Sequence, residues 1–239
     1  MIEKAINKIL ELAEPHVMLF NGRDYCDKKM IPIDHELRAD YIPMTTLSSL
    51  VDYVRSGMDV KDQRYIIHIV SPTEVRLISG LDGDRKRETL VIVNAELPEF
   101  SFNREVEKER FVIGIQSKFV DNLTDDKALI LKFAGTVKSG TVAEYSDDGV
   151  SQKCAVKKGI SSMTEALVPS PCSLTPYRTF TEVQQPTSSF IFRLSDGRDG
   201  EVYCALYEAD GGSWRSAAKE NIRKYLEEQL SDVGILIVS

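Results

Sequence analysis

The amino-acid sequence predicts an α+β protein in which largely antiparallel sheets combine with amphipathic helices near the N-terminus, in mid-chain and near the C-terminus. Helical periodicity occurs in separate stretches, whereas strand patterns occur in runs joined by short turns. The regular strand–helix alternation that produces parallel α/β folds is absent. With 239 residues, 42% of them hydrophobic, the chain is long and apolar enough to bury a substantial core.

The first predicted element is an amphipathic helix at the N-terminus. Its apolar residues share one helical face: Ile2, Ala5, Ile6, Ile9, Leu10 and Ala13. Pro15 ends this pattern, and residues 16–20 then form a short predicted strand. That strand ends at Asn21–Gly22, a turn signal, and residues 23–43 show no regular pattern.

A second helix is predicted over residues 45–55. Thr45 or Thr46 can cap its start, and Gly57 can close its end by taking a left-handed conformation.

Three consecutive antiparallel strands are predicted next, over residues 65–70, 74–79 and 89–94. They are rich in β-branched residues, and breaks at Ser71–Pro72 and residues 80–83 separate them. These strands predict a meander.

Two further helices are predicted in the middle of the chain. The first lies within residues 104–121, where three large apolar residues stand four apart: Phe111, Ile115 and Phe119. The second follows an acidic capping cluster at residues 124–126 and ends near Gly135.

From residue 136 the pattern is almost entirely that of strands. Residues 136–145 and 150–157 flank a hairpin turn at residues 146–149, and a further strand is predicted over residues 160–168.

The last stretch begins with residues 177–185, which we interpret as short or edge-strand structure. The prolines on either side have no N–H to donate to a β-ladder, which confines them to edges or strand ends. Residues 190–195 and 201–208 are expected to pair with each other. A helix from Ser213 and a final strand over residues 235–238 close the chain.

Two portions follow from this order of elements. Residues 1–135 form a portion of helices and a meander, and residues 136–239 form a strand-rich portion closed by a helix and a strand. Because no linker separates them, one continuous domain is the alternative.

Composition excludes several classes of function. The net charge of −7 disfavours a bulk electrostatic grip on nucleic acid, although a local basic groove stays open. The four cysteines are scattered, without zinc or dithiol spacing, so we expect reduced, mostly buried thiols and no metal or cofactor. No signal-peptide pattern or membrane-spanning apolar run is present, which predicts a cytoplasmic protein.

The candidate binding residues come from a segment with a high density of flat polar and aromatic side chains: Tyr177, Arg178, Phe180, Gln184, Gln185, Phe192 and Arg193. Such side chains suit a pocket for a base, nucleotide or peptide, because stacking and bidentate hydrogen bonds require rigid flat groups. They equally suit a protein–protein contact. A third interpretation is an Arg and Gln network that satisfies backbone groups around two prolines.

Gly211 and Gly212 complete the candidate set together with Trp214. They lie between a strand and the helix expected from Ser213, where backbone N–H groups can hold an anion. The alternative is a tight turn whose glycines take positive φ and whose Ser213 caps the helix. The binding residues predicted from the sequence are therefore Tyr177, Arg178, Phe180, Gln184, Gln185, Arg193, Gly211, Gly212 and Trp214.

No stretch has the residues of a known catalytic apparatus, so no catalytic residue is assigned. Three acid pairs lie beside glycine in predicted turns: Asp82 and Asp84, Asp147 and Asp148, and Glu208 and Asp210. Turn chemistry explains them without a site. The three histidines lack a recognisable nucleophilic partner.

Several short motifs, in this order, resemble the YfdQ-like family of phage and prophage proteins of unknown function. They are DDGVSQ at residues 147–152, PYRTF at 176–180, Gln185–Pro186, SFIFR at 189–193 and ALYEADGGSW at 205–214. The resemblance extends over most of the chain from about Tyr65. It implies a viral origin and a role in the cytoplasm of a bacterial host, and it brings no assigned catalytic residues.

The leading hypothesis is a non-enzymatic, homo-oligomeric phage protein that acts by binding, in host takeover or counter-defence. One alternative is a nucleotide- or single-strand-binding protein in which Tyr177, Arg178 and Trp214 contact the ligand. A second alternative is a metal-dependent hydrolase with an acidic site at Asp147 and Asp148 or at Glu208 and Asp210.

Overall fold

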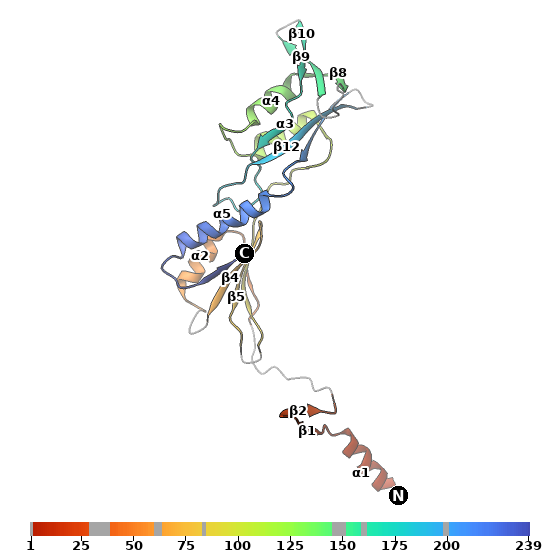
Figure 1. Cartoon of the computed structure of the whole chain (residues 1–239), viewed down its shortest axis with the longest axis vertical. Coiled ribbons are helices and arrows are strands. Elements are labelled where there is room, and N and C mark those ends of the chain that lie inside the picture. Colours follow the sequence, from red (N-terminus) through yellow and green to blue (C-terminus); the bar gives the residue numbers. More distant parts are fainter. Residues whose placement is uncertain are drawn as a thin grey trace. The chain divides into compact units, whose positions relative to one another are not determined.

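A computed structural model describes residues 2–28, 39–59, 64–82, 85–144, 152–158, 162–197 and 201–239. The α+β class predicted from the sequence is confirmed. The chain divides into two compact units, Met1–Ala39 and Asp40–Ser239, whose elements are drawn in Figure 1.

The first unit consists of a helix and a two-stranded hairpin. Helix α1 (Ile2–Ala13) and strand β1 (Val17–Phe20) confirm the prediction, and β2 (Arg23–Cys26) pairs with β1 in antiparallel register. Asn21 and Gly22 take φ values of 51° and 74° in the two-residue turn, as such hairpins require. Strand β2 was not predicted, because its sequence lacks alternation and the turn alone sets its pairing.

The second unit contains a five-stranded sheet in the order β14-β4-β5-β6-β3. Strands β4 (Tyr65–Ser71), β5 (Glu74–Ser79) and β6 (Thr89–Asn94) form the predicted antiparallel meander. The final strand β14 (Leu236–Val238) pairs in parallel with β4, and the unpredicted β3 (Ile42–Met44) pairs in parallel with β6. Because β3 contains Pro43, which lacks an N–H, it suits only an edge.

Helices α2 (Leu47–Ser56) and α5 (Trp214–Gln229) pack together against this sheet (Figure 1). The Thr46 hydroxyl accepts a hydrogen bond from the N–H of Ser49, and Gly57 closes α2 at φ 62°, as the sequence predicts. The first core includes the following buried residues of the sheet and the two helices: Leu47, Leu50, Ile67, Ile69, Val75, Leu77, Val91, Val93, Ile222 and Leu226.

A second sheet has the order β11-β12-β13-β7. It comprises β11 (Cys172–Leu174), β12 (Ser188–Asp196), β13 (Val202–Glu208) and β7 (Val106–Glu107). The expected pairing of residues 190–195 with 201–208 is confirmed by the β12–β13 register.

Two helices pack their apolar faces against the second sheet. They are α3 (Lys108–Lys118) and α4 (Lys127–Thr136), both of which the sequence predicts. Their buried residues join those of the sheet in a second core: Phe111, Ile115, Ile130, Ala134, Phe190, Phe192 and Leu206.

A third sheet contains β8 (Val137–Glu144), β9 (Gln152–Lys158) and β10 (Ser162–Leu167), joined in antiparallel order. This confirms the predicted hairpin, whose turn at residues 146–149 lies outside the described residues.

The prediction of short or edge-strand structure over residues 177–185 is wrong. The only ladder contact described next to it is an isolated bridge between Pro176 and Phe119, and the segment is irregular backbone with one turn at residues 181–183. Its backbone groups bond instead to the side chain of Gln185. Residue 135 lies within α4, and both cores combine residues from either side of it.

Candidate functional site

The predicted binding residues fall at several places in the second unit. Arg178, the most buried charged side chain among them, has 6% of its side chain exposed. Its guanidinium carbon lies 4.4 Å from the ring centroid of Phe102, 5.0 Å from that of Phe190 and 4.7 Å from that of Trp214. Packing of this kind uses the flat faces of the guanidinium for internal cation–π contacts.

The charge of Arg178 is compensated inside the fold. Its Nη1 lies 3.1 Å from Oε1 of Glu208 and donates to the hydroxyl of Ser188 at 3.5 Å. Burial lowers the pKa of Arg178, and the nearby carboxylates of Glu208 and Asp210 oppose this shift. Removal of one partner of this pair would leave an uncompensated buried charge, which is strongly destabilising.

Gln185 satisfies the backbone of the turns that precede it. Its Oε1 accepts hydrogen bonds from the N–H groups of Arg178 and Thr179, at 2.9 and 3.1 Å. Its Nε2 donates to the carbonyl oxygens of Thr179, Phe180 and Val183. Gln185 therefore matches the part of the third interpretation in which a side chain satisfies backbone groups, whereas the Arg178 side chain bonds to the side chains of Glu208 and Ser188.

Gly211 and Gly212 form the strand-to-helix turn before α5, with φ values of 63° and 80°. The predicted cap at Ser213 is wrong, because this residue is already helical and its side chain makes no capping bond. Asp210 takes that role, since its Oδ1 accepts from the N–H of Gly212 at 2.9 Å.

The carboxylate of Asp210 occupies the position where the helix start attracts negative charge. Burial would raise the pKa of Asp210, but hydrogen bonds from Gly212, Ser188 and Trp214, with the charge of Arg178, outweigh it and lower the pKa. The chain thus supplies its own anion at this helix start.

The other predicted residues lie apart from Arg178. Phe180 is buried in the first core, and Phe192 in the second. Arg193 lies on β12 opposite Ala205. Tyr177 and Gln184 line a cavity of about 470 Å³ together with Gln185.

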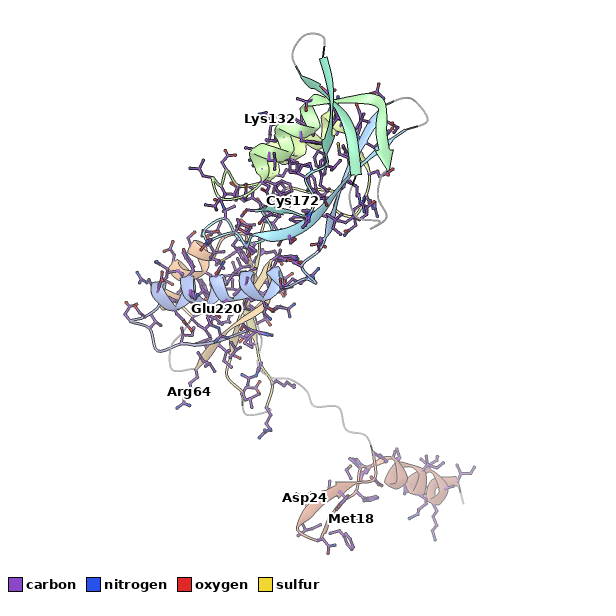
Figure 2. All side chains as sticks on the ribbon, turned by 45° about the horizontal axis from the view of Figure 1, so that its top comes forward. Met18, Asp24, Arg64, Lys132, Cys172 and Glu220 are labelled. Atoms are coloured by element: carbon purple, nitrogen blue, oxygen red, sulfur yellow. The ribbon has the colours of Figure 1, made fainter. Side chains whose placement is uncertain are left out.

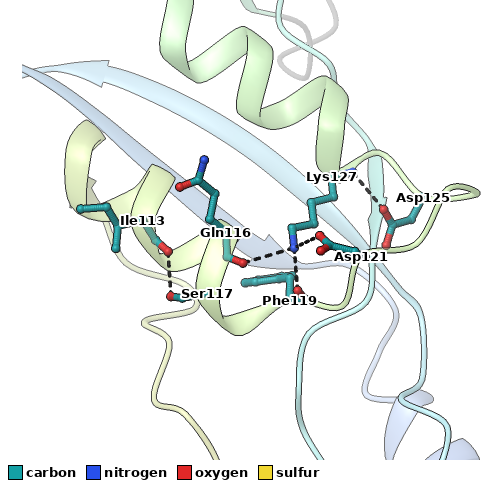
Figure 3. A network of polar contacts seen from close by, with 7 residues as sticks. All are labelled: Ile113, Gln116, Ser117, Phe119, Asp121, Asp125 and Lys127. Carbon is teal, nitrogen blue, oxygen red and sulfur yellow. Dashed lines mark hydrogen bonds and ion pairs between the residues drawn. The ribbon is translucent and has the colours of Figure 1, made fainter.

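A buried lysine is the first feature that sequence reasoning missed (Figure 3). The side chain of Lys127 is 7% exposed, and its Nζ donates to the carbonyls of Phe119 and Gln116, at 2.7 and 3.3 Å, and to Oδ1 of Asp121 at 2.5 Å. These acceptors come from the C-terminal end of α3 and the residues after it. With its ammonium protons in use, Lys127 caps α3.

The second feature that sequence reasoning missed is that the apolar side chains of the first unit are exposed. None of the residues in this unit whose burial the structure describes is buried. The large apolar side chains that are at least half exposed belong to both α1 and the hairpin: Ile2, Ile6, Ile9, Leu10, Val17, Met18, Leu19, Phe20 and Tyr25. Figure 2 shows side chains of the hairpin, including the labelled Met18, projecting from the ribbon. The sequence signal for such a surface was the helical periodicity of the apolar residues in α1.

Of the cysteines whose burial the structure describes, two are buried and a third is exposed. Burial raises the pKa of Cys172 and Cys204 to about 12, so both are protonated, unreactive thiols, while Cys26 is exposed. The acids Asp84, Asp147 and Asp148 lie outside the described residues.

The part of the chain that the structure describes contains neither a metal-binding cluster nor a membrane-spanning helix. No group of three or more His, Cys, Asp or Glu is placed to hold a metal ion. No helix in this part of the chain has the length and apolar character needed to cross a membrane.

Comparison with protein-family models, with curated proteins and with solved structures finds no match for this chain. The resemblance to the YfdQ-like family therefore stays a prediction.

Proposed function

We propose that the protein is a non-enzymatic, self-assembling binding protein whose copies associate through their first units. The observation that supports this proposal is that no residue of that unit is buried among those whose burial is described, despite its large apolar side chains. The partner that we assign to this surface is a second copy of the same chain.

The elements of the first unit are poorly stable alone. A helix of 12 residues, the length of α1, is marginal in water without packing. A single two-stranded hairpin is marginal as well. Side-chain packing against another surface would stabilise both elements, because it removes their apolar side chains from water.

The size of the apolar surface fits a protein–protein interface. Ile2 is 77% exposed, Leu19 71% and Phe20 63%. With about 150–200 Å² for each fully exposed large side chain, the nine apolar residues expose on the order of 1,000 Å² in total. This area is divided between α1 and the two faces of β1, because successive strand residues point to opposite sides. A standard interface buries about 800 Å² on each partner, and a monomer rarely exposes a larger apolar patch than about 600 Å².

The charge of the first unit favours a second copy as the occupant. Residues 2–28 carry five acidic and four basic side chains, a net charge of −1, in a chain of net charge −7. Two such units do not repel each other strongly, and a self-complementary patch is the usual basis of a two-fold dimer. A strongly basic or acidic partner would require the opposite charge on this surface.

The biological setting belongs to the same proposal. A phage-encoded protein in the cytoplasm of a bacterial host, acting in host takeover or counter-defence, is what the motif resemblance implies. The nucleotide-binding alternative stays a prediction, and the internal contacts of Arg178 and Trp214 give it no support.

A matched pair of variants on α1 tests the proposal. Ile6, on the apolar face, is replaced in Ile6→Glu, and its neighbour Asn7, on the polar face, is replaced in Asn7→Glu. Each change adds one negative charge to the same helix. We expect the full chain and Asn7→Glu to share an oligomeric mass in light scattering, and Ile6→Glu to give the monomer.

Two outcomes would contradict the proposal. One is a monomeric mass for the unchanged chain. The other is association of that chain with anionic lipid vesicles in place of self-association, which would assign the apolar surface to a membrane.

A further inference from the structure

The cavity beside Tyr177 is built from three segments of the second unit. Residues 120–122 follow α3, residues 175–177 follow β11, and residues 181–187 form the turns before β12. Its volume of about 470 Å³ lies within the usual range of small-molecule sites.

The walls of this cavity are held in place by backbone hydrogen bonds. The N–H of Val120 donates to the carbonyl of Thr175 at 2.8 Å, and the N–H of Tyr177 donates to that of Lys118 at 3.0 Å. The five hydrogen bonds of the Gln185 side chain fix a third side. A ligand would therefore meet a site that needs little ordering on binding.

The lining is polar but almost without charge. It includes hydroxyl and amide groups from Asn122, Thr181, Gln184 and Thr187, and no lining residue is Lys, Arg or His. The only charged lining residue is Asp121, whose carboxylate is paired with Lys127 at 2.5 Å. A phosphate group bound here would lose its hydration without a positively charged side chain to replace it. The cavity therefore disfavours phosphorylated ligands.

We infer that this cavity binds a neutral ring compound with several neighbouring hydroxyl groups, either a saccharide or the ribose of an unphosphorylated nucleoside. The amide and hydroxyl groups suit a ligand that offers both donors and acceptors. Tyr177 adds an aromatic face for the apolar side of the ring. This site lies in the second unit and does not depend on self-association.

Titration of the full chain with three sets of probes tests the inference. The first set contains neutral mono- and disaccharides, the second contains nucleosides, and the third contains the corresponding nucleoside monophosphates. Ligand-observed NMR and calorimetry report binding. We expect saturable binding in the first or second set, and binding about tenfold weaker or more for the monophosphate of any nucleoside that binds.

Variants place the binding at this cavity. Tyr177→Ala and Gln184→Ala should each weaken binding by about threefold to tenfold. Gln184 is exposed, so its replacement keeps the fold. Tyr207→Ala, which removes another tyrosine outside the cavity lining, should leave binding unchanged.

Three results would overturn the inference. The first is no saturable binding in any set. The second is tighter binding of monophosphates than of nucleosides. The third is an equal loss of binding in Gln184→Ala and Tyr207→Ala.

Discussion

At the scale of single residues, the side-chain amide of Gln185 replaces the ladder pairing that the turns around it lack. It accepts from two backbone N–H groups and donates to three carbonyl oxygens. Buried backbone groups without such partners are costly. One side chain thus fixes the segment that carries Arg178 and lines the cavity.

Replacement of Gln185 should therefore destabilise the fold strongly. We expect Gln185→Ala to lower the free energy of unfolding by about 2–4 kcal/mol, because it leaves several buried backbone groups unpaired. Gln185→Glu should also destabilise, since a carboxylate cannot donate to the three carbonyls. Gln184→Ala, at the exposed neighbour, should change stability by less than about 0.5 kcal/mol. Urea unfolding measures all three, and equal effects at both positions would contradict this role.

Asp210 gives a prediction for pH dependence. Its pKa in the folded state lies below the ordinary value of 3.8. Its carboxylate therefore stabilises the fold above about pH 4, and that stabilisation is lost as the pH falls through the lower folded pKa. In urea unfolding, the stability difference between the unchanged chain and Asp210→Asn should be largest near neutral pH and should shrink on acidification. A pH-independent difference would show that the charge of Asp210 has no such role.

The sequence identifies the flat polar and aromatic side chains of the candidate segment, but it does not show which residues they contact. The sequence shows that Arg178 and Gln185 are flat polar groups near aromatic residues. It does not show that the guanidinium of Arg178 packs on Phe102 and pairs with Glu208, which lie far away along the chain. Tertiary packing decided which predicted residues face a cavity, and only Tyr177, Gln184 and Gln185 do so at the 470 Å³ cavity.

At the scale of elements, α3 and α4 pack side by side against one sheet. Each helix contains a glycine, and the two glycines differ in how close the nearest side chain lies. A Cβ at Gly114 in α3 would lie 2.9 Å from Cε2 of Phe100. A Cβ at Gly135 in α4 would meet nothing within 4 Å. The first glycine is needed for close packing, and the second is not.

The same substitution should thus have opposite effects in the two helices. Gly114→Ala should destabilise by about 1–3 kcal/mol because it overpacks the contact with Phe100. Gly135→Ala should stabilise by about 0.5–1 kcal/mol because alanine favours the helix. Thermal and urea unfolding of both variants measure this, and destabilisation by Gly135→Ala would contradict the packing described for α4.

Elements were predictable where local pattern and tertiary structure agree. The helix α2 carries its cap at Thr46 and its stop at Gly57, and the strands of the meander carry alternating apolar residues. The short strands β2 and β3 have no such pattern and exist because a neighbouring strand pairs with them. Residues 177–185 have strand-like composition, but the flanking Pro176 and Pro186 and the Gln185 side chain favour irregular backbone.

At the scale of the whole molecule, the two units differ in what they bury. The second unit, Asp40–Ser239, contains two cores with many fully buried apolar residues. The first unit has an equally clear apolar pattern, and none of its residues with a described burial is buried. Sequence periodicity shows that a face of α1 is apolar, but it cannot show which surface covers that face.

The mass of the full chain over a wide range of concentrations tests self-assembly through the first unit most directly. Sedimentation velocity should give at least twice the 26.9 kDa of one chain at micromolar concentration, with dissociation on dilution. Ile6→Glu should sediment as the monomer under the same conditions. A mass of 26.9 kDa for the unchanged chain at every concentration would contradict the account.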